Sequence, residues 1–147
     1  MKVREVCSRS VPTIRPDELL VDAARRMREW RVAGLVVTDE AQHPIGILTD
    51  RDIVLRAVAL HADRVTALSV SEIMSRDVAT AMADEPVDVA FARMRTLGVR
   101  RLPVVGVDGR LEGLVTLNDV LAVMSDNLRN LISLVGRELQ HDTHVHP

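Results

Sequence analysis

The chain contains an internal repeat with a constant offset of 67 residues, the separation of Thr49 and Thr116. At this offset the chain aligns with itself without a gap. Identical residues recur in the pairs Glu5 and Glu72, Val11 and Val78, Asp17 and Asp84, Met27 and Met94, Leu35 and Leu102, Gly46 and Gly113, and Asp52 and Asp119. Self-similarity at a fixed period indicates repeated structural units. We expect copy 1 at residues 1–67, copy 2 at 68–134, and a helix end and tail at 135–147.

The first half of each copy has the pattern of a strand followed by a helix. Short apolar segments at 11–14 and 78–81 predict strands, and the acidic pairs Asp17-Glu18 and Asp84-Glu85 then suit a helix N-terminus. The expected core-facing residues at helical spacing are Leu20, Ala23, Ala24, Met27 and Trp30 in copy 1, and Val87, Ala90, Phe91, Met94 and Leu97 in copy 2.

The second half of each copy predicts two strands and a helix. The strands are expected at 35–38 and 45–48, and again at 102–105 and 111–115, with Asp108-Gly109 as a hairpin turn in copy 2. A β-α-β-β-α unit of about 60 residues cannot cover both faces of its sheet. The sequence therefore predicts an α+β fold in which two such repeats pack together with pseudo-two-fold symmetry.

Composition excludes several classes of partner. The chain of 147 residues has a formal net charge of −2, so no excess of positive charge favours nucleic acid. It has one Trp, one Phe and no Tyr, so the core must be aliphatic and stacking platforms for single strands are lacking. The single Cys7, the absence of a signal-peptide pattern and the lack of a long apolar segment lead us to expect a cytoplasmic protein without a membrane span.

Both copies carry the motif Gly-x-x-Thr-x-x-Asp where the last predicted strand meets the last helix. Its Thr and Asp are Thr49 and Asp52 in copy 1, and Thr116 and Asp119 in copy 2. One interpretation is a capping box that starts the helix. The other is a nucleotide site, because a helix N-terminus attracts phosphate and a carboxylate can accept hydrogen bonds from a ribose diol. The sequence leaves both interpretations open.

The doubled motif resembles that of the cystathionine-β-synthase (CBS) domain, which occurs as tandem pairs called Bateman modules. The resemblance covers about residues 3 to 130, and also includes the string Thr49-Asp50-Arg51-Asp52-Ile53 and the run at 99–105. It implies a stand-alone regulatory module that binds an adenosine ligand such as AMP, ADP, ATP, NAD or S-adenosylmethionine. It also implies that the motif Asp binds ribose, that the motif Thr approaches phosphate, and that the first two strands of a copy frame the adenine.

The ligand-binding residues that follow from this resemblance belong to both copies. They are Thr13, Leu35, Thr49, Arg51, Asp52, Val78, Thr80, Arg100, Arg101, Leu102, Pro103, Thr116, Asn118 and Asp119. Copy 2 has Arg100-Arg101 where copy 1 has Ala33-Gly34, and guanidinium groups suit phosphate oxygens. We therefore expect two unequal sites, with more phosphate charge at the arginine pair, although a solvated surface pair is the alternative.

Other charged groups favour structural explanations. The helical Arg25, Arg26, Arg28 and Arg31 are expected on a solvated face. His141, His144 and His146 are expected in a frayed tail, and no metal site is predicted. No pattern of a nucleophile with its base is present, so an enzyme is not predicted and no catalytic cofactor is expected.

The last predicted helix has an apolar stripe that continues well past its counterpart in copy 1. Its members are Val120, Leu121, Met124, Leu128, Leu131, Ile132, Val135 and Leu139. This stripe predicts a homodimer through the helix, and the regulated protein is expected to be a separate chain. The competing hypothesis is a structural dimerisation or interaction module in which both motifs are only helix caps.

Overall fold

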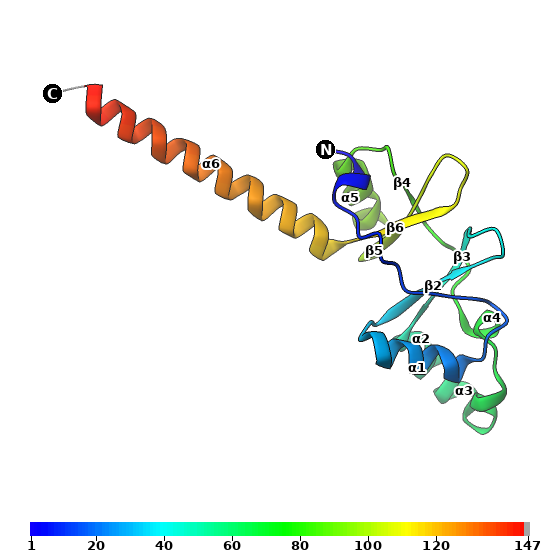
Figure 1. The fold of residues 1–147 in the computed structure, drawn as a ribbon. Coiled ribbons are helices and arrows are strands. Elements are labelled where there is room, and N and C mark those ends of the chain that lie inside the picture. The colour runs from blue at the N-terminus through cyan, green and yellow to red at the C-terminus, as the bar shows by residue number, and fades with distance from the viewer. Residues whose placement is uncertain (146–147) are drawn as a thin grey trace.

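The computed structural model describes the backbone of residues 1–145 and the side chains of residues 1–140. Copy 1 contains β1 (Thr13–Ile14), α1 (Leu20–Trp30), β2 (Gly34–Thr38), β3 (Pro44–Thr49), α2 (Asp50–Asp52), the π-helix η2 (Ile53–Val58), α3 (Ala59–His61) and the 3-10 helix η3 (Ala62–Ala67), all preceded by the 3-10 helix η1 (Val3–Glu5). Copy 2 contains α4 (Val70–Ile73), β4 (Ala81–Met82), α5 (Val87–Leu97), β5 (Arg101–Val105), β6 (Leu111–Thr116) and α6 (Leu117–Val145). The predicted α+β fold with a β-α-β-β-α order in each copy is confirmed (Figure 1).

Each copy forms a three-stranded sheet with the same topology. In copy 1 the order is β1-β2-β3, with β1 parallel to β2 and β2 antiparallel to β3, and the sheet β4-β5-β6 repeats this arrangement. The register also repeats, because Gly34 pairs with Thr49 and, 67 residues later, Arg101 pairs with Thr116. The pairing of β2 with β3 is therefore repeated residue for residue in the pairing of β5 with β6.

The first strand of each copy is shorter than predicted. The segment at 11–14 contributes only Thr13–Ile14 to its sheet, and the segment at 78–81 contributes only Ala81, with β4 continuing to Met82. Pro12 has no backbone N–H to donate, although its carbonyl still accepts a hydrogen bond from the Val36 N–H at 2.9 Å. The other four strands lie within one residue of their predicted bounds.

The core consists of two aliphatic clusters, one for each sheet. Fully buried members include Ile14, Leu20, Leu35, Val37 and Leu48 around the first sheet, and Ala81, Leu102, Val104 and Val115 around the second. Branched aliphatic side chains of this kind fill space without polar atoms that need partners. The prediction of a core with almost no aromatic residues is confirmed, since Phe91 is only partly buried.

The expected core stripes of α1 and α5 are wrong at their C-terminal ends. Trp30 and its counterpart Leu97 are about half exposed, at 51% and 52%, and Ala24 is exposed too. Each helix stops immediately afterwards at a residue in the left-handed region, Arg31 at φ 54° and Gly98 at φ 68°. The last side chains border surface cavities instead of the core, Trp30 beside Val32 and Leu97 beside Val99. The Arg26 guanidinium lies over the Trp30 ring, with Arg26 Cζ 5.6 Å from the ring centroid.

The beginning of each copy packs on the other copy. Val3 is completely buried in the second cluster, and its N–H donates to the Glu85 carbonyl at 2.9 Å. In the same way Val70 is buried in the first cluster, and its N–H donates to the Glu18 carbonyl at 2.9 Å. This exchange of equivalent segments ties the two copies into one body.

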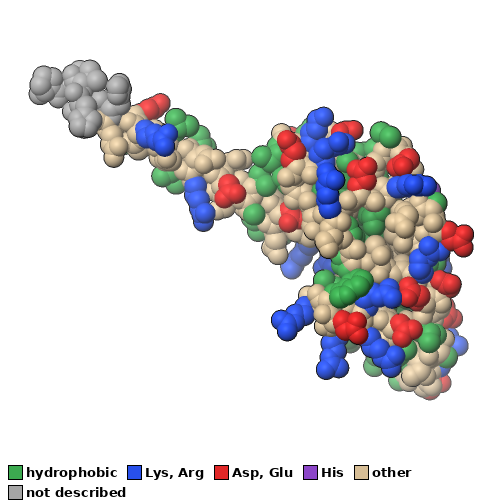
Figure 2. Space-filling model, in the orientation of Figure 1, with side chains coloured by type: hydrophobic (Ala, Val, Ile, Leu, Met, Phe, Trp, Pro, Cys, Tyr) green, Lys and Arg blue, Asp and Glu red, His purple; other side chains and the backbone are tan. Residues whose placement is uncertain are grey.

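Helix α6 begins against the second sheet and then projects away from the body (Figure 1). Figure 2 shows hydrophobic side chains along this projecting part. The predicted tail with His141, His144 and His146 lies outside the residues whose side chains the structure describes.

Candidate functional site

Both Gly-x-x-Thr-x-x-Asp motifs form capping boxes. The Thr49 N–H donates to Asp52 Oδ2 at 3.0 Å, and the Asp52 N–H donates to Thr49 Oγ1 at 3.1 Å. The Thr116 N–H donates to Asp119 Oδ2 at 2.9 Å, and the Asp119 N–H donates to Thr116 Oγ1 at 3.2 Å. These bonds satisfy two backbone donors that a helix start leaves free. The Oδ1 atom of each Asp accepts no hydrogen bond from the described residues.

The motif glycines have a packing role. A Cβ atom on Gly113 would lie 2.8 Å from Cys7 Sγ and 2.8 Å from the Ser8 carbonyl oxygen. A Cβ atom on Gly46 would lie 2.6 Å from the sulfur of Met74, the counterpart of Cys7. Only glycine lets the exchanged segment lie directly on the last strand of the opposite sheet. Burial in this contact raises the pKa of the Cys7 thiol, as expected for a packed rather than a reactive cysteine.

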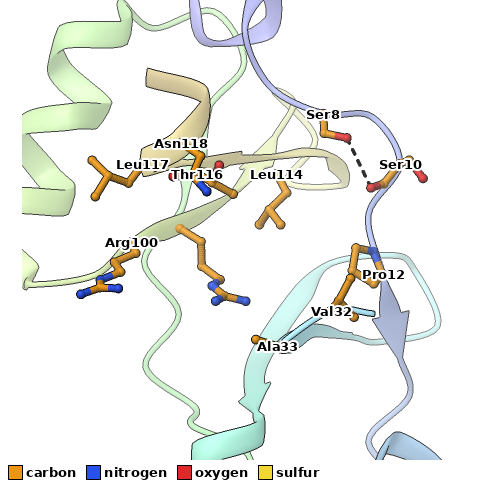
Figure 3. Close-up of a pocket in the computed structure, with 12 residues that line it drawn as sticks. Ser8, Ser10, Pro12, Val32, Ala33, Arg100, Leu114, Thr116, Leu117 and Asn118 are labelled. Carbon is orange, nitrogen blue, oxygen red and sulfur yellow. Dashed lines mark hydrogen bonds between the residues drawn. The ribbon is translucent and has the colours of Figure 1, made fainter. Parts of the chain in front are cut away.

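A cavity of about 530 Å³, here called cavity A, opens between the two copies beside the second motif (Figure 3). Copy 1 contributes Ser8, Ser10, Pro12, Val32, Ala33 and Gly34, and copy 2 contributes Arg100, Arg101, Leu114, Thr116, Leu117 and Asn118. Its lining includes two arginines and no carboxylate. Such a lining is suited to a ligand with an apolar part and a negative charge.

A second cavity of about 550 Å³, cavity B, lies at the pseudo-symmetric position. Its lining residues are Ile47, Arg76, Asp77, Val78, Ala79, Leu97, Val99, Arg101 and Leu102. Several are counterparts of cavity A residues, for example Ile47 of Leu114 and Val99 of Val32. The charge of this lining differs from that of cavity A, because Asp77 occupies the position of Ser10. The Arg76 guanidinium is partly engaged, since it donates to the Ser71 carbonyl at 2.9 Å.

Part of the predicted ligand-binding set comes together at these cavities. Arg100, Arg101, Thr116 and Asn118 line cavity A, and Val78, Arg101 and Leu102 line cavity B. The predicted residues that line neither cavity are Thr13, Leu35, Thr49, Arg51, Asp52, Thr80, Pro103 and Asp119. Leu35 and Pro103 are fully buried within their strands, so their side chains serve the core. The ligand-binding roles of the whole set stay predictions.

Sequence reasoning missed the contribution of the exchanged N-terminal segment to cavity A. Ser8 and Ser10 line this cavity, and the Ser8 hydroxyl donates to the Ser10 carbonyl at 3.4 Å (Figure 3). Both precede the first strand, where the sequence pattern indicates neither a helix nor a strand. The offset alone pairs Ser8 with Ser75, but it does not reveal that the segment crosses to the other sheet.

The expectation of a fully solvated arginine face on α1 is wrong for Arg26. Its side chain is 27% exposed, and it donates to Glu18 Oε1 at 2.8 Å and to the Thr13 carbonyl at 3.0 Å. Arg93 repeats the arrangement with Glu85 at 2.6 Å and the Thr80 carbonyl at 2.8 Å. The identity of these residues at the repeat offset is the signal that could have revealed the pair. In both copies hydrogen bonds from the arginine lower the pKa of the glutamate.

The described residues contain no group of three or more His, Cys, Asp and Glu side chains placed to hold a metal ion. None of the described helices is long and apolar enough to cross a membrane.

The family model described as "CBS domain" matches the chain twice, over residues 3–58 and 70–126. The chain belongs to the CBS-domain family. The two matched segments correspond to the two sheets with their helices, so this is a CBS pair. The resemblance inferred from the doubled motif is confirmed.

Relatives of this CBS pair include small proteins and much longer enzymes. It is 40% identical over 125 residues to the uncharacterized protein MK0525 of Methanopyrus kandleri, and these residues span 84% of this chain and 62% of that protein. It is 31% identical over 125 residues to the CBS domain-containing protein YhcV of Bacillus subtilis, spanning 85% of this chain and 86% of that protein. It is 32% identical to an inosine-5'-monophosphate dehydrogenase of Methanocaldococcus jannaschii, spanning 82% of this chain but only 23% of that enzyme.

Solved structures of CBS pairs have the same fold. The CBS domain pair of protein MJ0100, in complex with 5'-methylthioadenosine and S-adenosyl-L-methionine, superimposes with a TM-score of 0.75 at 28% identity, covering 86% of this chain and 98% of that one. Hypoxic Response Protein I, solved with two coordinated zinc ions, superimposes with a TM-score of 0.74 at 30% identity, covering 83% and 98%. Structural neighbours of this CBS pair thus include one that binds adenosine compounds.

Proposed function

We propose that this CBS pair is a regulatory module that binds an adenosine nucleotide of the AMP, ADP or ATP type and passes the bound state to a separate partner protein. The observation that carries the proposal is cavity A, which has two arginines and no carboxylate among its lining residues. Its volume of about 530 Å³ lies within the usual range of small-molecule sites, about 300–1,000 Å³. The adenosine compounds bound by the MJ0100 pair support the choice of the base.

The apolar part of each cavity suits an adenine held without aromatic stacking. Pro12, Val32 and Leu114 line cavity A, whereas Val78 and Val99 line cavity B, and neither lining contains an aromatic residue. Aliphatic side chains can cover both faces of a base while backbone groups nearby supply hydrogen bonds to its edge. We therefore expect affinity to come from apolar contact, from the arginines and from the motif residues.

The motif aspartates are proposed as ribose acceptors. In Asp119 the Oδ2 atom accepts from the Thr116 backbone N–H and from the Thr116 hydroxyl at 3.0 Å, which leaves Oδ1 free to accept from a ribose hydroxyl. The Thr116 hydroxyl proton is already used in this geometry. It would have to rotate away from Asp119 to donate to a phosphate, so we assign the phosphates chiefly to Arg100 and Arg101.

Ligand binding would regulate through the arrangement of the two copies. Cavity A has lining residues from both copies, so a bound nucleotide contacts both at once. A ligand shifts a conformational equilibrium only when it binds one arrangement better than another. In this proposal the partner recognises the arrangement that the nucleotide favours, and no catalytic step is involved.

Calorimetric titration with AMP, ADP, ATP, NAD and S-adenosylmethionine tests the proposal, with adenosine as the ligand that has no phosphate. ADP should bind to the wild-type protein, and Arg100→Ala should weaken ADP binding by roughly 10-fold while adenosine binding changes little, because charge-assisted hydrogen bonds to phosphate are lost. Arg95→Ala removes an exposed arginine that lines neither cavity and is the matched control. The proposal fails if none of these ligands binds.

The capping boxes support the alternative of a structural module without a nucleotide ligand. Both boxes are complete without any ligand. If they are only caps, Asp52→Ala and Asp119→Ala should each lower the free energy of unfolding by about 1 kcal/mol without changing any ligand response. A loss of ADP affinity in Asp119→Ala beyond this stability effect would instead favour the nucleotide site.

We also propose that the chain forms a homodimer through α6. Leu121, Met124, Leu128, Leu131 and Val135 alternate at spacings of three and four residues and are 53 to 60% exposed. This is the a/d spacing of a coiled coil, and no charged residue lies within it. A second copy of the same helix offers an identical apolar seam, which a two-fold interface requires.

A further inference from the structure

Arg101 lies between the two candidate nucleotide sites. It lines cavity A together with Arg100, and it lines cavity B together with Arg76. Its counterpart at the repeat offset is Gly34, which has no side chain to offer either cavity. The pair of cavities is therefore built around one guanidinium group where exact symmetry would supply two.

The position of Arg101 depends on this asymmetry. A Cβ atom built on Gly34 would lie 2.5 Å from Arg101 Nη1. The guanidinium therefore lies directly against the backbone of Gly34, which is the counterpart of Arg101 in copy 1. In the sheet Arg101 pairs with Thr116, which also lines cavity A. The guanidinium makes no hydrogen bond or ion pair with the described residues, so nothing among them holds it to either cavity.

The remaining charges make the two cavities unequal. Without Arg101, cavity A keeps the positive charge of Arg100 and has no carboxylate in its lining. Without Arg101, cavity B keeps Arg76, whose charge is offset by Asp77 and which is partly engaged by the Ser71 carbonyl. A phosphate therefore meets a positive site in cavity A, but a nearly neutral one in cavity B whenever Arg101 is turned away.

We infer that Arg101 is shared by the two sites, so that a phosphate bound in cavity A withdraws it from cavity B and weakens phosphate binding there. This inference rests on the proposed function, because it needs both cavities to accept adenosine ligands. Coupling of this kind is reciprocal and commonly amounts to about 5-fold or more in affinity. It acts on phosphate only, so adenosine should bind the two sites without coupling.

Calorimetry with ADP and adenosine measures the coupling directly. ADP should give two binding events per chain with the second at least about 5-fold weaker, and adenosine a smaller difference. Arg101→Ala should weaken the first ADP event and leave the second unchanged, because the second already occurs without this guanidinium. Equal weakening of both ADP events would overturn the inference, since it would mean that Arg101 serves the two sites independently.

A variant that blocks cavity A provides the second test. Ser10 is exposed and lines cavity A but not cavity B, so Ser10→Trp should fill cavity A without disturbing the core. Cavity B of this variant should bind ADP at least about 5-fold more tightly than in the second wild-type event, because Arg101 is then free to turn toward it. Adding Arg101→Ala should abolish the gain, whereas adding Arg95→Ala should not.

The outcomes separate this inference from the proposed function. If neither ADP nor adenosine binds, the proposed function itself fails. If both bind and Ser10→Trp leaves the affinity of cavity B for ADP equal to that of the second wild-type event, the nucleotide sites stand and the sharing of Arg101 is refuted.

Discussion

Each copy of the chain contains the same partly buried ion pair, Glu85 with Arg93 in copy 2 and Glu18 with Arg26 in copy 1. Glu85 is 13% exposed and Arg93 is 33% exposed, and both guanidinium Nη atoms donate to the carboxylate, at 2.6 and 3.0 Å. The arginine also donates to the Thr80 carbonyl, so it ties α5 to the segment that leads into β4. A bidentate pair with an additional backbone acceptor orients the helix as well as contributing energy.

This pair predicts a pH dependence of stability. The hydrogen bonds from Arg93 lower the pKa of Glu85 below its ordinary 4.5, against the opposing effect of burial. Because the folded-state pKa is the lower one, the stabilisation is fully present above pH 4.5 and is lost as the pH falls through the folded value. Glu85→Gln should therefore lower the free energy of unfolding at pH 7 by about 1–2 kcal/mol, and the difference from wild type should shrink on acidification.

Urea unfolding at several pH values measures the effect of Glu85→Gln. Asp22→Asn is the control, because Asp22 forms an exposed pair with Arg25, whose side chain is 74% exposed. That substitution should change stability by less than about 0.5 kcal/mol at any pH. A difference between Glu85→Gln and wild type that is constant with pH would contradict the prediction.

Gly113 and Gly136 differ in the space around them, so their substitution by Ala should have opposite effects on stability. Gly113→Ala would place a methyl group 2.8 Å from Cys7 Sγ and from the Ser8 carbonyl oxygen, and the latter is backbone that cannot turn aside. Gly136→Ala on α6 meets nothing within 4 Å and gains helix propensity. Thermal unfolding should show a loss of about 1–3 kcal/mol for the first and a gain of up to about 1 kcal/mol for the second. Equal effects would contradict the packing role of the motif glycine.

The first turn of α6 and the remainder of the helix have different roles. Its first turn packs Val120 into the second core cluster, whereas the residues from Leu121 onward expose large apolar side chains. Its counterpart in copy 1 breaks into α2, η2 and α3 and returns to the body at η3. The same motif thus starts two helical segments, and only the second extends beyond the fold.

The proposed dimer depends on the apolar seam of α6. Leu128→Arg places a charge in the centre of the proposed coiled coil, so a dimer of the wild type should become a monomer in sedimentation at micromolar concentration. Asn130→Arg lies off the seam and should leave the dimer intact. A dimer that survives Leu128→Arg would move the interface elsewhere, for example to the exposed apolar residues Val54, Leu55 and Val58 of η2.

The exchanged segments couple the unfolding of the two copies. Residues near the N-terminus complete the core of copy 2, and residues at 68–74 complete the core of copy 1. Neither sheet can keep its full core if the other copy unfolds. We therefore expect one cooperative unfolding transition rather than two.

Val3→Ala tests this interlocking. Val3 is completely buried in the second cluster although it is the third residue of the chain. Its truncation should lower the free energy of unfolding by about 2 kcal/mol and shift a single transition for the whole chain. Val107→Ala, at a side chain that is 92% exposed, should have no measurable effect. Two separate transitions in Val3→Ala, monitored by circular dichroism, would contradict the interlocked fold.

The repeat, the order of elements in each copy, the family and the aliphatic nature of the core could all be predicted from the sequence. These features follow from periodicity and residue identity, which are local properties of the sequence. Each pattern occurs twice because of the repeat. The resemblance to the CBS family also predicted four of the residues that line cavity A, Arg100, Arg101, Thr116 and Asn118.

The sequence did not predict which copy each terminal segment packs against. Val3 and Ser8 belong to copy 1 in sequence but pack on the sheet of copy 2, and the sequence pattern contains no signal for that crossing. The structure also decided that Trp30 is exposed and that Arg101 lies against Gly34, because both depend on where chain segments far apart in sequence meet. Periodicity specifies which face of an element is apolar, whereas long-range packing determines what that face contacts.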